Sequence, residues 1–278
     1  MKAHRYFGPF LFLASEMLFT VSFALAKYIA PTIDFGHLLW LRFVPALVLI
    51  PFFWSRKIVF RVGSPKLMLF RSLLGVASIG CFMYSLKWGE LGRVCIINAS
   101  GTLWAFFWSM FVLKERPHIF SGLAIVLTLL GLFLIFQPSL SSLSFADLVA
   151  LLGSFLVAMV YVSLKKLRET HNAEAIVFCF FMTGLLISTV YCVLYPHAIS
   201  WHILALGLIT GVAGFFAQIL MTVGYRYCPV SVSSFIKLSS SVVMVAIGML
   251  LFGDPFNLLT SVGMAMVIGS IYVITVFQ

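Results

Sequence analysis

The sequence predicts an all-α, polytopic membrane protein: ten transmembrane helices in two inverted five-helix repeats, with both termini in the cytoplasm. Three observations lead to this fold class. Hydrophobic residues make up 62% of the chain and charged residues only 9%, whereas soluble domains carry roughly 25% charged residues. The apolar residues fall into ten runs, each long enough to cross a bilayer as a helix. Several features of the first half recur in the second half at a constant offset.

Short charged or Pro/Gly-containing breaks separate the apolar runs. Helices satisfy their own backbone hydrogen bonds in lipid, and the short alternating segments of a barrel do not occur. The first run carries Glu16 at its middle and lacks a cleavage site, so it is a retained helix and not a signal peptide. Pro45 is expected to kink the second run. We expect helices near 7–27, 36–54, 67–87, 92–113, 118–136, 145–164, 175–195, 200–223, 229–251 and 257–277.

The basic residues orient these helices. With the N-terminus in the cytoplasm, thirteen of the eighteen Lys and Arg residues fall in or next to inside segments. Outside segments keep only Lys27, Lys87 and Arg93, while Arg42 and Lys237 fall within spans. The positive-inside rule therefore predicts that both termini lie in the cytoplasm. We expect a multi-pass protein of the bacterial inner membrane. The same placement explains the net charge of +10 without a nucleic-acid partner.

Internal repetition appears when the chain is compared with itself at an offset of 139 residues. Matched pairs are Lys27 with Lys166, Ser15 with Ser154, Gly75 with Gly214, Lys87-Trp88 with Arg226-Tyr227, Ser100 with Ser239, and Glu115 with Asp254. We expect a first repeat over 1–139 and a second over 140–278. Because five spans are an odd number, the second repeat enters the membrane in the opposite sense. In secondary transporters this architecture places the solute site near the midplane between the halves. The alternative is a duplication without a transport role.

The motifs that carry a family resemblance occur once in each half. In the first half they run from Tyr84 to Lys87, through Lys114-Glu115-Arg116, to the stretch between Gly122 and Gly131. The second copy runs from Gly224 to Tyr227, through Gly253-Asp254-Pro255, to Gly269, and Leu41-Arg42-Phe43 resembles the second helix of the same family. The chain resembles the EamA-type transporters of the drug/metabolite transporter superfamily. The resemblance implies ten helices, an inverted repeat and the transport of small metabolites.

Three ionisable residues fall inside predicted spans: Glu16, Arg42 and Lys237. Such groups cost at least about 2.5–3.5 kcal/mol at mid-span, so they normally face a cavity or a partner. We expect them to line a central cavity and to contact a charged or zwitterionic solute. The alternatives are a structural ion pair between Glu16 and a basic residue and, for Arg42, snorkelling toward the outer surface.

Further candidates for solute contact lie in the fourth and ninth runs. The repeat offset places Asn98 opposite Lys237 and Ser100 opposite Ser239. Trp104 and Trp108 share one helical face and could stack on a solute. Helix packing is the alternative for the polar residues, and a packed or lipid-facing stripe is the alternative for the tryptophans.

Charged residues near helix ends have other expected roles. Glu115 and Asp254 lie at the ends of runs and are expected to cap helices or to hold gating loops. Arg71 follows the basic segment between the second and third runs and is expected to be a topology or headgroup residue.

The predicted function is secondary active or facilitative transport of a small polar or zwitterionic metabolite, such as an amino acid or an S-adenosylmethionine-like compound. A flippase for lipids or lipid-linked sugars is the main alternative, followed by a channel. No enzyme is predicted, because no catalytic or nucleotide-binding motif is present. No cofactor or metal is expected, since the cysteines and histidines do not cluster. The expected partners are the solute and membrane lipid, with the chain as a monomer or homodimer.

Overall fold

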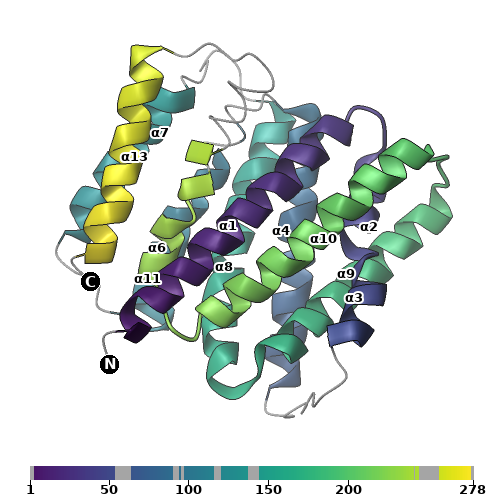
Figure 1. Cartoon of the computed structure of the whole chain (residues 1–278), viewed down its shortest axis with the longest axis horizontal. Helices are drawn as coiled ribbons and strands as arrows, with labels where there is room; N and C mark the ends of the chain where they lie inside the picture. Colours follow the sequence, from purple (N-terminus) through teal and green to yellow (C-terminus); the bar gives the residue numbers. More distant parts are fainter. Residues whose placement is uncertain are drawn as a thin grey trace.

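The structure is a computed structural model, and it describes residues 3–53, 64–89, 94, 97–115, 120–136, 144–240, 242–243 and 257–276. All secondary structure in these ranges is helical, and the helices form one bundle (Figure 1). The helices are α1 (Ala3–Ile29), α2 (Phe35–Phe43), α3 (Ala46–Phe53), α4 (Pro65–Trp88), α6 (Gly101–Val112), α7 (Ser121–Phe136), α8 (Phe145–Thr170), α9 (Ala173–Leu194), α10 (Trp201–Gly224), α11 (Val230–Ile236) and α13 (Leu258–Val276).

Five of the described helices are long and apolar enough to cross a membrane: Tyr6–Ile29, Pro65–Trp88, Phe145–Thr170, Ala173–Leu194 and Trp201–Gly224. Shorter apolar helices span Phe35–Pro51, Ser121–Ile135 and Leu258–Ile274. Each of these eight coincides with a predicted run. The fourth and ninth runs lie partly outside the described residues, so the number of ten crossings stays a prediction.

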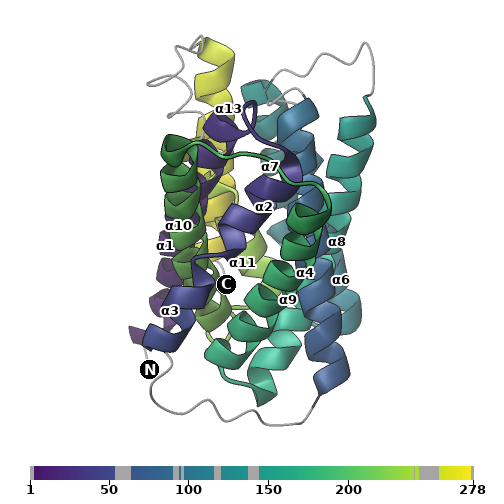
Figure 2. The same cartoon turned by 90° about the vertical axis from the view of Figure 1, so that its right-hand side faces the viewer.

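Local chemistry explains several helix boundaries. Ser144 and Asp147 form a capping box at the start of α8, with Ser144 N donating to Asp147 Oδ2 over 2.8 Å. Pro65 occupies the first turn of α4, where a missing N–H costs nothing. The second run breaks at Val44–Pro45, where α2 ends and α3 begins (Figure 2). This confirms the predicted effect of Pro45, because proline cannot donate within the helical ladder.

The fourth and ninth runs are interrupted at corresponding places. In the first half, the helical turn 97–99 ends at Ser100 before α6 begins. In the second half, α11 ends at Ile236 and a turn follows at Lys237 and Leu238. Each turn contains a backbone hydrogen bond between residues three apart, where an α-helix joins residues four apart. These bonds run from Leu103 N to Ser100 O and from Ser240 N to Lys237 O. Tight turns of this kind within a helix often mark a functional hinge.

The two halves interlock in a reciprocal pattern. The most extensive helix contacts are those of α1 with α10, α7 with α13, and α4 with α8. α1 and α4 belong to the first half of the chain, whereas α10 and α8 belong to the second. Figure 1 shows α1 and α10 side by side, with α7 and α13 at one end of the molecule and α2, α3 and α9 at the other. The core is therefore built largely from pairs that cross between the halves.

Hydroxyl groups connect these crossing pairs. Ser15 Oγ on α1 donates to Ala217 O on α10 over 2.9 Å, and Thr128 Oγ1 on α7 donates to Ser270 Oγ on α13 over 2.9 Å. A comparable contact joins Thr102 Oγ1 on α6 to Ser234 O on α11 over 3.1 Å. Such bonds hold helices together in lipid, where apolar contact alone gives little preference for protein over the surrounding chains.

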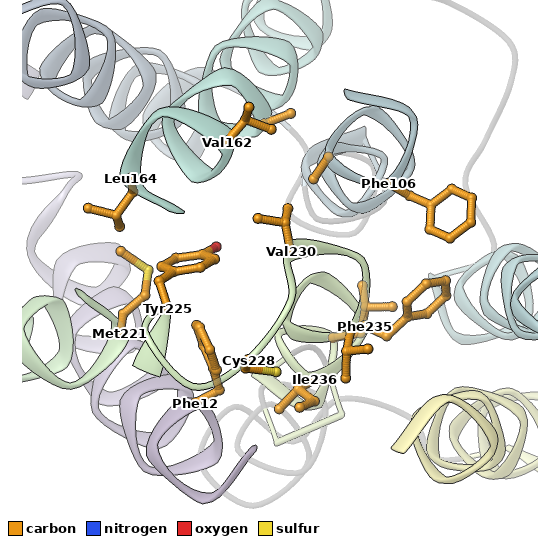
Figure 3. Packing of buried hydrophobic residues seen from close by; sticks show 14 of the residues in the cluster. Phe12, Phe106, Val162, Leu164, Met221, Tyr225, Cys228, Val230, Phe235 and Ile236 are labelled. Carbon is orange, nitrogen blue, oxygen red and sulfur yellow. The ribbon is translucent and has the colours of Figure 1, made fainter. Parts of the chain in front are cut away.

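The largest hydrophobic cluster fills the space between α1, α6, α8, α10 and α11 (Figure 3). At its centre Phe12 and Tyr225 meet edge to face, with ring centroids 4.9 Å apart. Phe106 on α6 and Phe235 on α11 meet in the same geometry, 6.1 Å apart. Edge-to-face pairs combine burial with favourable quadrupole contacts. This cluster joins both halves on the side of the bundle where α1 begins.

Candidate solute-binding cavity

A cavity of about 170 Å³ lies in the middle of the bundle. This exceeds by far the roughly 10–15 Å³ that a single water needs. From the first half it is lined by residues of α1, α2, α4, α6 and the segment before α6. From the second half it is lined by residues of α8, α9, α10 and the segment after α11. Its charged residues are Glu16, Arg42, Arg71 and Lys237, and its uncharged polar residues are Thr20, Ser78, Asn98, Thr102, Tyr161, Gln218 and Ser240.

Lys237 extends from the interruption after α11 into a box of aromatic rings. Its Nζ lies 3.4 Å from the ring centre of Tyr161, 5.6 Å from that of Tyr225 and 5.9 Å from that of Phe12. Nζ also lies 2.9 Å from Met221 Sδ. The faces of aromatic rings attract cations, so the box stabilises the ammonium of Lys237 without a carboxylate in contact.

Glu16 lies on α1 near this ammonium but does not bind it directly. In the part of the chain that the structure describes, no carboxylate oxygen of Glu16 comes within 4.0 Å of a basic nitrogen. Ser240, whose Oγ donates to Lys237 O over 2.7 Å, lines the same cavity. The side chain is 6% exposed and lines the cavity. Glu16 and Lys237 therefore place opposite charges in one cavity without forming a closed ion pair.

Arg42 points inward from the end of α2. Its side chain is only 1% exposed, so the structure does not place it in the snorkelling orientation. Nη1 donates to Ser22 Oγ over 2.7 Å, and Ser22 Oγ donates to Thr210 O over 2.8 Å. The guanidinium also lies 5.2 Å from the ring centre of Phe23. Gly214 on α10 leaves room for it, because a Cβ at that position would lie 2.9 Å from Nη1.

Arg71 lies in the cavity and not at a membrane surface, so the expectation of a topology or headgroup residue was wrong. It is 1% exposed, and its guanidinium carbon lies 4.3 Å from the ring centre of Phe180 on α9. α4 begins at Pro65, which puts Arg71 nearly two turns inside the helix. The nearby basic residues in the sequence made it look like part of the preceding loop.

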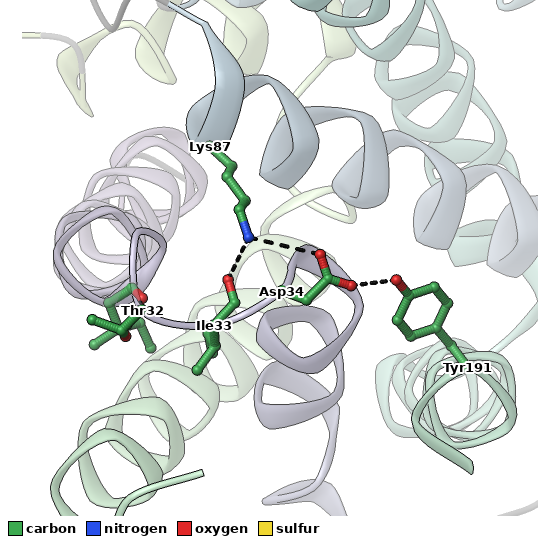
Figure 4. Close-up of polar contacts among 6 residues, drawn as sticks. Thr32, Ile33, Asp34, Lys87 and Tyr191 are labelled. Carbon is green, nitrogen blue, oxygen red and sulfur yellow. Dashed lines mark hydrogen bonds and ion pairs between the residues drawn. The ribbon is translucent and has the colours of Figure 1, made fainter. Parts of the chain in front are cut away.

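Polar contacts close the bundle at the end where α1 meets α2 (Figure 4). Lys87 Nζ donates to Ile33 O over 2.7 Å and lies 3.7 Å from Asp34 Oδ1. The hydroxyl of Tyr191 on α9 donates to Asp34 Oδ2. Burial raises the pKa of Asp34, but the hydrogen bonds from Tyr191 and the Phe35 backbone and the charge of Lys87 outweigh it and leave this pKa below its usual value. The sequence predicts that this end faces outward, so we call Asp34, Lys87 and Tyr191 the outer clasp.

A second set of polar contacts lies at the opposite end, where α11 begins. Glu115 Oε1 and Oε2 accept from Val230 N and Ser231 N, each over 2.9 Å. Lys165 Nζ at the end of α8 donates to Tyr225 O over 2.9 Å and to Cys228 O over 3.0 Å. A carboxylate at a helix N-terminus satisfies free N–H groups and suits the helix dipole. The expected capping role of Glu115 is thus confirmed, while Asp254 lies outside the described residues. The sequence predicts that this end faces the cytoplasm, so we call Glu115 and Lys165 the inner clasp.

Comparison with known proteins identifies the family. The model of the EamA-like transporter family matches residues 6–137 and again 144–276. The chain belongs to the EamA-like transporter family. It is an integral, multi-pass membrane transporter, and its bacterial relatives place it in the inner membrane.

Related sequences and structures agree with this EamA-like assignment. Two proteins named "Uncharacterized transporter", from Helicobacter pylori strains J99 and 26695, are each 23% identical over 95% of this chain and 93% of their own length. A solved crystal structure of a protein covers 96% of this chain and 95% of its own, with 15% identity and a TM-score of 0.79. At that identity the structural likeness establishes the fold alone.

The EamA-like fold brings together only some of the sequence-predicted site residues. Glu16, Arg42, Asn98 and Lys237 all line the cavity, whereas Ser100, Trp104, Trp108 and Ser239 lie outside its lining. Ser100 Oγ bonds to Ile97 O and Ser154 Oγ, as expected for helix packing. Trp104 and Trp108 both pack on Phe155 of α8, with ring centroids 5.6 and 6.1 Å away. Ser240, next to Ser239, faces the cavity in its place.

Arg71, Thr20, Ser78 and Thr102 are polar cavity residues that sequence reasoning missed. Tyr161 and Gln218, from α8 and α10, also line the cavity. Arg71 could have been recognised by its distance from the start of α4 at Pro65. Hydropathy alone does not locate that start to the residue. Thr20, Ser78 and Thr102 carry no such signal, because hydroxyl residues also occur where helices pack.

Proposed function

We propose that this protein moves a small polar metabolite with both positive and negative groups, such as an amino acid or an S-adenosylmethionine-like compound, by alternating access. One observation carries the proposal: a central cavity lined by both halves holds a carboxylate and cationic groups that are not locked into an ion pair. Charged groups inside a membrane normally pair with each other or serve a passing solute. Here Glu16 is available to an ammonium group, and the basic residues are available to a carboxylate.

The architecture supports alternating access. We propose that residues 1–139 and 140–278 are two five-helix repeats of opposite orientation, with ten crossings and cytoplasmic termini. α1 begins and α13 ends at the same end of the bundle (Figure 1). Lys27 Nζ donates to Leu86 O over 2.7 Å, and Lys165 Nζ donates to Tyr225 O, which lies 139 residues after Leu86. Inverted repeats with interrupted helices at the solute site are typical of secondary transporters.

The two clasps are the parts that must open in turn. The outer clasp joins the loop before α2 to α4 and α9. The inner clasp joins the loop after α6 to the start of α11, and the last turns of α8 to the segment between α10 and α11. The polar contacts of both clasps are formed in this structure. Opening one clasp while the other stays closed exposes the solute to one side of the membrane at a time. The polar bonds of each clasp are replaced by water when it opens, so the cost of opening is modest.

The proposal is tested by a binding screen on purified protein in nanodiscs. Thermal shift is measured with amino acids, S-adenosylmethionine, nucleosides and polyamines at several concentrations. We expect at least one zwitterionic compound to stabilise the wild type. Glu16→Gln is expected to weaken that response about ten-fold or more, because hydrogen bonds to charged groups contribute about 1.5–3 kcal/mol.

Matched control variants distinguish the loss of a cavity charge from the loss of a charge elsewhere on the protein. Glu169→Gln and Lys166→Met remove an acidic and a basic group from exposed positions near the end of α8. These controls should respond to the compound as the wild type does. A response that is unchanged in Glu16→Gln and in Lys237→Met would show that the cavity charges do not bind the solute.

A further inference from the structure

The charges that line the cavity do not balance. Arg42, Arg71 and Lys237 face a single acidic side chain, Glu16, which leaves a formal excess of two positive charges. Lys237 is stabilised by aromatic faces and by Met221. For the two arginines, burial of charge in a membrane protein is costly unless an anion or a set of acceptors compensates it. The excess therefore points to a missing anionic group.

The arginine donors show where this group would bind. Arg71 Nε and Nη1 are buried without a hydrogen-bond partner, and so is Arg42 Nε. Both side chains are 1% exposed and line the cavity. A guanidinium has five N–H donors, and a carboxylate or phosphate is the acceptor that its planar fork matches in a bidentate manner. The Phe180 ring, whose centre lies 4.3 Å from Arg71 Cζ, gives a cation–π contact but no hydrogen-bond acceptor.

The two guanidinium groups lie beside glycines that occupy matching positions in the two halves. Gly214 on α10 lies beside Arg42 Nη1, and Gly75 on α4 lies beside Arg71 Nη1, 3.6 Å from the position of a Cβ. These glycines are separated by 139 residues, the repeat offset. Arg42 reaches its glycine from α2, whereas Arg71 comes from the same helix as Gly75. Both arginines belong to the first half of the chain, and the fold places one guanidinium beside each of the two matching glycines.

We propose that Arg71 and Arg42 together form an oxyanion site and that the solute is a small metabolite with a net negative charge. This inference rests on the proposed transport function and narrows it. Of the zwitterionic compounds considered above, those with an additional carboxylate or phosphate fit the cavity best. Such a solute places its ammonium group, where it has one, toward Glu16, and its acidic groups at Arg71 and Arg42.

The test uses four-carbon probes of similar size and different charge: succinate, aspartate, asparagine and 1,4-diaminobutane. Inorganic phosphate and a short-chain phosphatidic acid are added to distinguish a soluble oxyanion from a lipid headgroup. Thermal shift of the wild type in nanodiscs gives the apparent affinity for each probe. We expect succinate or aspartate to bind more tightly than asparagine, and 1,4-diaminobutane not to bind. Preference for asparagine or 1,4-diaminobutane, or for phosphatidic acid alone, overturns the proposal.

Substitutions at Arg71 locate the site. Arg71→Met should weaken binding of the acidic probe about ten- to hundred-fold, because it removes charged hydrogen bonds. Arg71→Lys should have an intermediate effect, since it keeps the charge but loses the fork. Arg226→Met removes the same charge from an exposed position and should bind like the wild type. Equal affinity in wild type and Arg71→Met contradicts the proposal.

Stability without ligand separates binding from a structural role. Arg71→Met removes a buried cation whose Nε and Nη1 have no hydrogen-bond partner. The melting temperature of the unliganded variant should therefore equal or exceed that of the wild type. A large decrease in melting temperature for both Arg71→Met and Arg71→Lys would show that Arg71 is structural and would overturn the site. Flux in liposomes distinguishes the two proposals. Flux restricted to uncharged or cationic probes refutes the oxyanion site alone, and binding of acidic probes without any flux refutes transport alone.

Discussion

The ammonium of Lys237 lies 3.4 Å from the centre of the Tyr161 ring, in contact with an aromatic face and not with the carboxylate of Glu16. Lys237 belongs to the interruption after α11, whereas Tyr161 belongs to α8. The contact therefore fixes the interrupted segment against a continuous helix. Because this cation has its own partner, Glu16 keeps its carboxylate available within the cavity.

Tyr161→Leu is expected to loosen this arrangement. It removes a cation–π contact that contributes about 0.5–2 kcal/mol, so the melting temperature of the unliganded protein should fall. Tyr161→Phe keeps the ring and serves as the control, with a melting temperature close to that of the wild type. Equal melting temperatures for Tyr161→Leu and Tyr161→Phe would show that the ring face does not hold Lys237.

Gly214→Ala is expected to impair solute binding through Arg42. The added Cβ would lie 2.9 Å from Arg42 Nη1, so the guanidinium must leave its bond to Ser22. We expect apparent affinity for the solute identified by thermal shift to fall by about ten-fold, the loss of one charged hydrogen bond. Gly80→Ala is the control, because its Cβ would meet nothing within 4 Å. Wild-type affinity in Gly214→Ala would show that the position of Arg42 is not critical.

The outer clasp should depend on pH through Asp34. The pKa of this carboxyl is lower in the folded protein than in the unfolded chain. Its stabilising contribution is therefore present above the unfolded value of about 3.9 and is lost as the pH falls through the folded value. We expect the wild type to melt above Asp34→Asn at neutral pH and this difference to shrink below about pH 4. A difference that is constant down to about pH 2 would contradict the assignment.

Glu115→Gln should destabilise the start of α11. The carboxylate accepts two backbone hydrogen bonds there, and loss of a charged cap costs about 1–2 kcal/mol. Chemical denaturation or melting of the variant in nanodiscs gives the change. Glu174→Gln, an exposed position in the first turn of α9, is the matched control and should have little effect. An equally small loss of stability in both variants would show that Glu115 does not stabilise the start of α11.

Hydropathy was sufficient to locate the described helices, because a bilayer demands apolar runs of a fixed length. The break at Pro45 and the cap at Glu115 were also predictable, since each depends on local backbone chemistry. Glu16, Arg42 and Lys237 could be placed at the cavity because charge inside a membrane span is rare and costly.

It was harder to predict which face of each helix is buried in the protein and which is exposed. Phe106 and Phe111 lie on the same helix α6, yet Phe106 is 5% exposed and Phe111 is 75% exposed. Lipid is as apolar as the protein core, so the sequence has no polar–apolar contrast to distinguish the two. Trp104 and Trp108 were assigned to the cavity for this reason, and the structure places them against Phe155. Arg71 was missed because a basic residue near a helix start usually marks topology.

Exchange flux in proteoliposomes tests the central claim most directly. Vesicles are loaded with the compound that gives the largest thermal shift, and uptake of the labelled compound is followed with and without the internal load. Alternating access through the cavity predicts saturable uptake that the internal load stimulates, and that Glu16→Gln and Lys237→Met abolish while Glu169→Gln and Lys166→Met do not. Uptake that does not saturate, or that is the same in all four variants, would contradict the account.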